Sequence, residues 1–373
     1  MSKMLYQNQA RTISSLAKRY PVVAVFGPRG NSKTHLVRSL FPTKNYVDFG
    51  NDTICALAKK SVKTFLLAFP NGAIINEANR IPGLVDAVRY YVDKWGYEPG
   101  RYILISCENF DISALEDRGI KVNLIGPSIE ELDKAAILTQ NPFHCIQSGA
   151  FPKVLDGTKT YAQILDSCFA KDFSRHINSS NTEHFLSFLK ACAACSGLPL
   201  SMNSLAKVTG VSAPTVKTWL QVLRTYHVAC QVTSEDNDNP KLFFTDSGLL
   251  CHLLGIDTKE QLILSPYKDQ IVRTFALMGL IKGRSQKALD SNIATSDRCD
   301  FIARWKLVYN IFIDPHVEVT IQTLKEAKHL SLKDRGNRTV VLYLGEVTYT
   351  QDGIDCIGYR DWTKFASGVD YFS

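Results

Sequence analysis

The segment at 27–34 constrains the fold most, because it has the pattern of a phosphate-binding loop between a strand and a helix. Its residues are Gly27, Pro28, Arg29, Gly30, Asn31, Ser32, Lys33 and Thr34. An apolar run at 22–26 precedes it, and a helical pattern that begins at His35 follows it. In such a loop the backbone N–H groups and the helix N-terminus surround the phosphates, while the lysine contacts the terminal phosphates. We therefore predict that residues 27–35 bind a nucleotide, with ATP and Mg²⁺ as cofactors and Thr34 as a metal ligand.

One position of this loop departs from the pattern. Ser32 stands immediately before Lys33, where phosphate-binding loops have glycine. Glycine tolerates a positive φ at that position and brings no Cβ toward the phosphates. An ordinary connection between a strand and a helix, with an incidental Lys-Thr pair, is the alternative interpretation.

A second phosphate-handling position follows the apolar run at 73–75. In P-loop ATPases this strand ends in two acidic residues, of which the first holds the Mg²⁺ shell and the second polarises the attacking water. Here the two residues are Asn76 and Glu77. We predict Glu77 as the catalytic base and Asn76, which binds metal only through its carbonyl oxygen, as a weaker metal partner. Nucleotide binding is therefore expected to survive even where ATP hydrolysis is weakened or lost.

Apolar runs alternate with helical patterns over the first third of the chain. Strands are expected at 22–26, 44–49, 72–75 and 101–106, and helices at 5–20, 52–69 and 83–95. This alternation predicts an α/β fold with a parallel sheet and helices on both faces. A chain of 373 residues is long enough for two or three domains.

The motifs together resemble those of a prokaryotic family of AAA-type ATP-binding proteins. The matching segments are 27–34, 74–82, 100–110, 115–118, 149–152 and 241–250. The resemblance implies a P-loop domain at 1–140, a helical linker with a winged helix at 141–238, and an endonuclease-like α/β domain at 239–373. It also implies Arg118, which keeps the arginine of the family's L-A-G-R segment, as a second catalytic residue.

Several phosphate-handling positions of that family carry replacements in this chain. Besides Ser32 and Asn76, Cys107 stands where the family has a serine that senses the γ-phosphate, and Lys171 stands where it has an arginine. Lysine keeps the charge of an arginine but cannot make its bidentate contact with a phosphate. These replacements favour loss of turnover, whereas the retained Lys33, Thr34 and Glu77 favour retained binding.

Residues 183–233 have the spacing of a winged helix, with the turn between two of its helices at 210–212. The residues that would contact DNA are Ser212, Thr215, Lys217 and Thr218. That helix offers one cation and no Arg or Asn for base edges, so we favour a structural or partner-binding role for it. The polar stretch at 234–240 is expected to be a flexible wing tip or linker.

The last third of the chain lacks the residue set of a nuclease. Restriction-type cores bind Mg²⁺ through a helix Glu, an Asp and a strand with Glu-x-Lys. The corresponding positions here are Gln270, Asp300 and a strand at 311–314 that has no Glu-x-Lys. One retained ligand does not make a metal site, so nuclease activity is not expected.

Composition excludes few classes of function. The net charge of +7 suits a nucleic-acid partner, but the basic residues are dispersed along the chain. No apolar stretch is long enough to span a bilayer, and the first residues lack the core of a secretion signal, so a cytoplasmic protein without a membrane partner is expected. Only Cys192 and Cys195 of the ten cysteines form a CxxC pair, which favours buried thiols over a zinc site.

Three hypotheses about function stay open at this point. The preferred one is an ATP-binding protein of the AAA type with weakened or lost ATPase activity. The second is a non-enzymatic regulatory or scaffold protein derived from such an ATPase, and the third is a DNA-binding regulator that uses the winged helix. A homo-oligomer or a protein partner is compatible with each of them.

Overall fold

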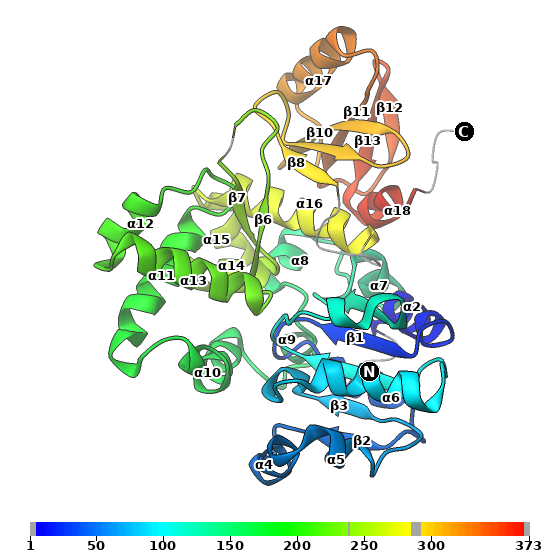
Figure 1. Ribbon diagram of the computed structural model, residues 1–373. Coiled ribbons are helices and arrows are strands. Elements are labelled where there is room, and N and C mark those ends of the chain that lie inside the picture. The colour runs from blue at the N-terminus through cyan, green and yellow to red at the C-terminus, as the bar shows by residue number, and fades with distance from the viewer. Residues whose placement is uncertain (1–4, 238, 285–291, 369–373) are drawn as a thin grey trace. The chain divides into compact units, whose positions relative to one another are not determined.

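The computed structural model describes residues 5–237, 239–284 and 292–368. These residues divide into two compact units, unit 1 at 5–125 and unit 2 at 126–284 and 292–368 (Figure 1). Both units combine helices with strands, which confirms the α/β class that the sequence predicts. The three predicted domains at 1–140, 141–238 and 239–373 stay a prediction. None of the described helices is both long enough and apolar enough to cross a membrane.

Unit 1 contains a five-stranded parallel sheet in the order β2-β3-β4-β1-β5. Its strands are β1 (Val22–Phe26), β2 (Tyr46–Asp48), β3 (Ile74–Asn76), β4 (Tyr102–Ser106) and β5 (Gly119–Asn123). This parallel sheet confirms the strands predicted from the apolar runs. β5 was not predicted, although it continues the sheet beside β1.

Helices cover both faces of this sheet (Figure 1). They are α2 (Gln7–Ala17), α3 (Lys33–Leu40), α4 (Asp52–Lys60), α5 (Val62–Leu66) and α6 (Leu84–Trp95). α2 contacts β1, and α3 contacts β3 and β4. Val22, Ala24 and Phe26 alternate along β1 and therefore share one face of the sheet. On that face they belong to a core that also contains Val88 and Tyr91 of α6.

The prediction of a single helix at 52–69 is wrong, because α4 ends before Ser61 and α5 begins after it. The backbone of Ser61 is extended, with φ −163° and ψ 101°, and its side chain accepts a hydrogen bond from the Thr64 N–H. Serine is a strong N-cap residue, so it begins a second helix, α5, where the helical periodicity suggested continuity.

In the described residues, unit 2 begins with seven α-helices and a hairpin. They are α7 (Ile129–Lys134), α8 (Pro142–Ser148), α9 (Pro152–Leu155), α10 (Tyr161–Lys171), α11 (Thr182–Ala194), α12 (Met202–Thr209), α13 (Ala213–Thr225), β6 (Ala229–Val232) and β7 (Lys241–Phe244). α11 packs on α12, α12 on α13, and the antiparallel hairpin β6–β7 follows. Three helices and a hairpin occupy the positions that the winged-helix hypothesis requires, and the assignment itself stays a prediction.

The rest of unit 2 forms a six-stranded sheet with the order β12-β13-β11-β10-β9-β8. Its elements are α14 (Ser247–Leu253), α15 (Lys259–Leu264), α16 (Lys268–Arg284), β8 (Ile293–Thr295), β9 (Phe301–Arg304), β10 (Val308–Asp314), α17 (Ile321–Lys333), β11 (Arg338–Tyr343), β12 (Tyr349–Gln351), β13 (Ile354–Gly358) and α18 (Trp362–Ser367). β10, β11 and β13 run parallel, and the outer strands run antiparallel to their neighbours. This is the separate C-terminal sheet that the sequence predicts.

Two of the motif segments in unit 2 meet at the buried carboxylate of Asp246. It accepts hydrogen bonds from the Ala150 N–H at 2.8 Å, the Tyr161 hydroxyl at 2.6 Å and the Leu249 N–H at 2.9 Å. Burial raises the pKa of Tyr161 well above its usual value, so the hydroxyl keeps its proton and donates. A Cβ at Gly149, where φ is +66°, would lie 2.2 Å from the Tyr161 oxygen. The motif residues Gly149 and Asp246 therefore have a structural role, because both are needed for this buried contact.

The stretch predicted as a flexible wing tip or linker is anchored to the C-terminal sheet at its beginning. The Thr295 N–H donates to the Thr233 carbonyl at 2.8 Å, and the Glu235 N–H donates to the Thr295 carbonyl at 2.9 Å. The Arg304 guanidinium binds the Glu235 carboxylate, with Nη2 and Oε2 2.6 Å apart, and lowers its pKa. Asp238, in the same stretch, lies outside the described residues. Within the stretch at 234–240, the prediction of flexibility is therefore wrong for Glu235.

Candidate nucleotide-binding site

The predicted phosphate loop connects β1 to α3 in unit 1. Ser32, which replaces the expected glycine, has φ 54° and ψ 20°, in the left-handed region. A residue with a Cβ adopts this conformation at a cost of about 1 kcal/mol. The serine thus fits the loop geometry, but with backbone strain that glycine would avoid.

Replacing Ser32 with glycine is expected to raise the free energy of unfolding of unit 1 by about 0.5 kcal/mol, because the strain exceeds the added flexibility of the unfolded chain. Chemical denaturation followed by circular dichroism measures this change. Ser39→Gly is the matched control, since Ser39 has helical geometry in α3 and glycine costs about 0.5 kcal/mol relative to serine there. Opposite signs for the two variants are expected, and equal destabilisation would contradict the assignment of strain to Ser32.

Two further residues hold the loop in shape. A Cβ at Gly27 would lie 2.0 Å from the Leu124 carbonyl oxygen, so only glycine fits where the loop passes the segment after β5. The side chain of Asn31 is buried; its amide nitrogen donates to the same Leu124 oxygen, and its amide oxygen accepts from the Tyr6 hydroxyl. The clamp by Tyr6 and Leu124 was missed from the sequence, because neither position carries a local pattern that points to the loop.

Lys33 places its ammonium group inside the loop. Its Nζ donates to the carbonyl oxygens of Gly27 at 2.7 Å and Pro28 at 2.8 Å, and it lies 3.4 Å from the Cys107 Sγ. The side chain is buried, and the cation is held by neutral oxygens that phosphate oxygens could replace. Cys107, predicted at the γ-phosphate-sensing position, is therefore next to the lysine that would contact the terminal phosphate.

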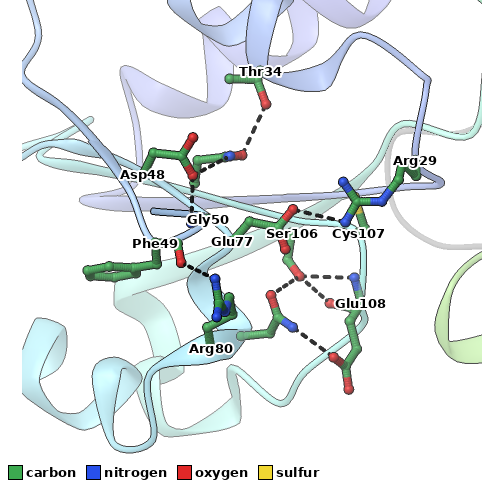
Figure 2. Close-up of polar contacts among 12 residues, drawn as sticks. Arg29, Thr34, Asp48, Phe49, Gly50, Glu77, Arg80, Ser106, Cys107 and Glu108 are labelled. Carbon is green, nitrogen blue, oxygen red and sulfur yellow. Dashed lines mark hydrogen bonds and ion pairs between the residues drawn. The ribbon is translucent and has the colours of Figure 1, made fainter. Parts of the chain in front are cut away.

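The predicted metal ligands Thr34 and Asn76 are also brought together. The Thr34 hydroxyl donates to the Asn76 Oδ1 at 3.0 Å, and the Asn76 Nδ2 donates to the Asp48 Oδ1 at 2.9 Å (Figure 2). Hydroxyl, amide and carboxylate oxygens are the ligands that Mg²⁺ prefers, so this donor set fits Mg²⁺. Asp48 was not predicted as part of the site, although it lies near the end of the strand predicted at 44–49, and the carboxyl ends of parallel strands meet at one edge of the sheet.

Glu77, the predicted catalytic base, forms an ion pair with Arg29 of the loop. The Arg29 Nη2 lies 3.2 Å from the Glu77 Oε1, with side-chain exposures of 19% and 12% (Figure 2). The backbone of Glu77 is left-handed, with φ 53°. The Glu77 carboxylate is therefore paired with Arg29, a cation of the loop that would surround the phosphates.

The structure does not bring Arg118 to this site. Arg118 precedes β5, whose first residue Gly119 pairs with Val22 at the beginning of β1, whereas the loop follows the end of β1. The length of a five-residue strand, roughly 15 Å, separates the two ends. Arg118 is bound there by Asp93, Glu116 and Asp117. Within one chain, its predicted catalytic role therefore has no geometric support.

A cavity of about 580 Å³ opens beside α3. It is lined by Thr34, His35, Arg38, Ser39, Phe41, Pro42, Lys44, Tyr46 and Ile74. His35, the last of the predicted nucleotide-binding residues, is exposed and faces this cavity rather than the inside of the loop. The volume is that of a small-molecule site, and its cationic lining suits an anion.

The predicted nuclease positions are occupied by internal contacts. Asp300 accepts the Ile313 N–H at 2.7 Å and pairs with the Arg273 guanidinium, which supplies the positive charge that a metal would bring. Gln270 offers an amide where a nuclease has a carboxylate. Among the described residues, no group of three or more His, Cys, Asp or Glu side chains could hold a metal ion.

The residues predicted to contact DNA serve mostly in local helix geometry. The Ser212 hydroxyl accepts from the Thr215 N–H and caps α13, and the Thr218 hydroxyl donates to the Pro214 carbonyl at 3.1 Å. Lys217 is exposed. A single lysine among these four residues gives little neutralisation of phosphate charge.

Comparisons with known proteins give distant matches. A family model described as a domain of unknown function (DUF8612) matches residues 145–260. A search of curated protein sequences gives no match. The Walker-type ATPase paby2304 of Pyrococcus abyssi is 14% identical over 66% of this chain and 95% of its own, with a TM-score of 0.41.

Two other solved structures are similar at the same level. RuvB of Thermotoga maritima is 14% identical over 64% of this chain and 91% of its own, with a TM-score of 0.34. A STAND (signal transduction ATPase with numerous domains) protein with a tetratricopeptide-repeat sensor, from Pyrococcus horikoshii, is 12% identical over 76% of this chain and 48% of its own, with a TM-score of 0.27. Likenesses this distant carry no argument about function, which depends instead on the geometry of the loop.

Proposed function

We propose that this chain binds ATP with Mg²⁺ at the loop between β1 and α3, and that its hydrolysis of ATP is weakened or lost. One observation carries the proposal: Lys33 lies inside a loop that is clamped in shape, while the next residue, Thr34, contacts the end of β3. An incidental Lys-Thr pair would not require a left-handed Ser32, a glycine against Leu124 and a buried Asn31.

Each part of the loop has a role in this proposal. The backbone N–H groups of the loop and the N-terminus of α3 would surround the phosphates. Lys33 would exchange the carbonyls of Gly27 and Pro28 for the terminal phosphates, and the Thr34 hydroxyl and the Asn76 oxygen would hold Mg²⁺. Mg²⁺, when bound, neutralises charge on the phosphates.

Three features support weak or absent hydrolysis. Asn76 is neutral where an ATPase has an acid, Cys107 stands where the family has a hydroxyl, and Glu77 is engaged by Arg29. Glu77 can act on water only when phosphates draw Arg29 away from it. We therefore propose Glu77 as the base for any remaining turnover and do not extend a catalytic role to Arg118.

The other parts of the chain are proposed to serve partners rather than chemistry. The α11–α13 helices with the β6–β7 hairpin would form a winged helix with a structural or partner-binding role, because its wing is attached to the C-terminal sheet. The C-terminal sheet would be endonuclease-like without nuclease activity, because Arg273 pairs with Asp300. Assembly into a homo-oligomer is part of the same proposal.

The proposal is tested by calorimetric titration of the full chain with ATP and Mg²⁺, followed by phosphate release under saturating ATP. We expect binding with slow or absent release. Any release should fall at least about 100-fold in Glu77→Gln, since a general base contributes 10²–10⁴-fold, while ATP affinity changes little. Glu98→Gln, at an exposed position of the same unit, is the control. Absence of ATP binding by the parent chain would overturn the proposed function, and undiminished release in Glu77→Gln would remove Glu77 from it.

A further inference from the structure

Asp48 lies beside Asn76 because the parallel register of β2 and β3 pairs these two residues. Adjacent strands are about 4.8 Å apart, so neighbouring side chains on one face reach each other. Both residues end their strands, at the edge of the sheet where β1 also ends and the phosphate loop begins. A carboxylate is therefore present one strand away from the position where P-loop ATPases carry their metal-binding acid.

The hydrogen bonds to Asp48 determine which way the Asn76 amide points. A carboxylate only accepts, so the Asn76 nitrogen faces Asp48, at 2.9 Å. The amide oxygen then faces the Thr34 hydroxyl, at 3.0 Å (Figure 2). The order Asp48–Asn76–Thr34 thus presents an oxygen, rather than a nitrogen, to the place where Mg²⁺ would bind.

Asp48 is itself held in place by neutral donors. Its Oδ1 accepts the Gly50 N–H at 2.8 Å, and its Oδ2 accepts the Tyr46 hydroxyl at 3.2 Å. Burial and the nearby carboxylate raise the pKa of Tyr46 to about 12, so the phenol stays a donor. In the described part of the chain, no ion pair matches the charge of Asp48, whereas Arg29 matches that of Glu77.

We propose that Asp48 is the positioning carboxylate of the Mg²⁺ site and restores, from β2, the negative charge that Asn76 lacks. It acts through Asn76, whose oxygen it aims at the metal, and it lowers the electrostatic potential at that oxygen. The inference rests on the proposed function, since it concerns the same nucleotide site. It predicts that a carboxylate at position 76 of β3, with an amide at position 48, supports the binding of Mg²⁺ and ATP as well as the native arrangement does.

The test compares ATP affinity with Mg²⁺ and with EDTA, by calorimetry on the full chain. The ratio of the two affinities measures the Mg²⁺ enhancement. Asp48→Asn is expected to lower this ratio about tenfold, as outer-shell partners of metal sites do, while affinity in EDTA is unchanged or higher. Mn²⁺ binding in the presence of ADP, followed by electron paramagnetic resonance, should weaken in parallel. Asp86→Asn, which removes the same charge from an exposed position on α6, should change neither quantity.

The double variant D48N/N76D gives the decisive comparison, because it keeps one carboxylate and one amide but exchanges their strands. Recovery of the Mg²⁺ enhancement is expected. If Asp48→Asn keeps the parent enhancement, the inference fails while nucleotide binding stands. Equal losses of affinity with Mg²⁺ and with EDTA, together with a lower melting temperature, would mean a merely structural role and also overturn it. If the parent chain binds no ATP under either condition, the proposed function itself fails.

Discussion

Replacing Lys33 with alanine is expected to lower ATP affinity at least about 100-fold. Hydrogen bonds to charged groups contribute about 1.5–3 kcal/mol each, and about 1.4 kcal/mol corresponds to a factor of ten. Lys33 places its ammonium group inside the loop, with its Nζ 2.7 Å and 2.8 Å from the carbonyl oxygens of Gly27 and Pro28. Calorimetry with Mg²⁺ and ATP measures the loss.

The stability of the Lys33→Ala variant separates lost binding from lost folding. Removal of the buried ammonium leaves two carbonyls without this donor but also relieves the desolvation of a charge, so the free energy of unfolding should change by no more than about 1 kcal/mol. Lys59→Ala, at an exposed position on α4, is the matched control and should bind ATP like the parent. Parent-like affinity in Lys33→Ala would remove the loop from the proposed site.

Replacing Asp246 with alanine is expected to destabilise unit 2 by about 3–5 kcal/mol. The substitution leaves the N–H groups of Ala150 and Leu249 without their acceptor in a buried environment, and leaves the Tyr161 hydroxyl with only the Ser148 carbonyl among the acceptors described for it. It also removes a negative charge that favours the charged form of Lys282, whose pKa burial lowers. Thermal unfolding followed by tryptophan fluorescence reports on this unit through Trp219, Trp305 and Trp362.

A double-mutant cycle with Tyr161→Phe tests whether the contact itself is responsible. Tyr161→Phe removes one hydroxyl and should cost about 1–3 kcal/mol alone, but less in the Asp246→Ala background, where only the hydrogen bond to the Ser148 carbonyl is left to lose. Asp269→Ala, at an exposed position on α16, should change stability by less than about 0.5 kcal/mol. Additive losses for Asp246 and Tyr161 would contradict the assignment of a shared buried contact.

The sequence predicted most of the elements of unit 1, because their signals are local. β1 was predicted with its observed bounds, and the helix at 83–95 appears as Leu84–Trp95. The break at Ser61 was missed because helical periodicity continues across it while a single cap decides the geometry. β5 was missed because its burial comes from pairing with β1 rather than from a long apolar run.

For the candidate site, local spacing predicted the loop and the residues that end β3. Loop, strand end and helix start are defined within a few residues, so their identity can be recognised without the fold. The contact between Thr34 and Asn76 followed from that pattern, since both motifs end at the same edge of a parallel sheet.

The partners of those residues were decided only by the tertiary structure. Asp48 reaches Asn76 through strand order and register, Tyr6 reaches Asn31 through the packing of the N-terminal segment, and Arg29 reaches Glu77 across the loop. No spacing in the chain encodes such contacts, because they join residues that are far apart in sequence and close only after the sheet forms. The sequence alone therefore indicated the kind of site that we propose for this chain, and the fold determined which charges surround it.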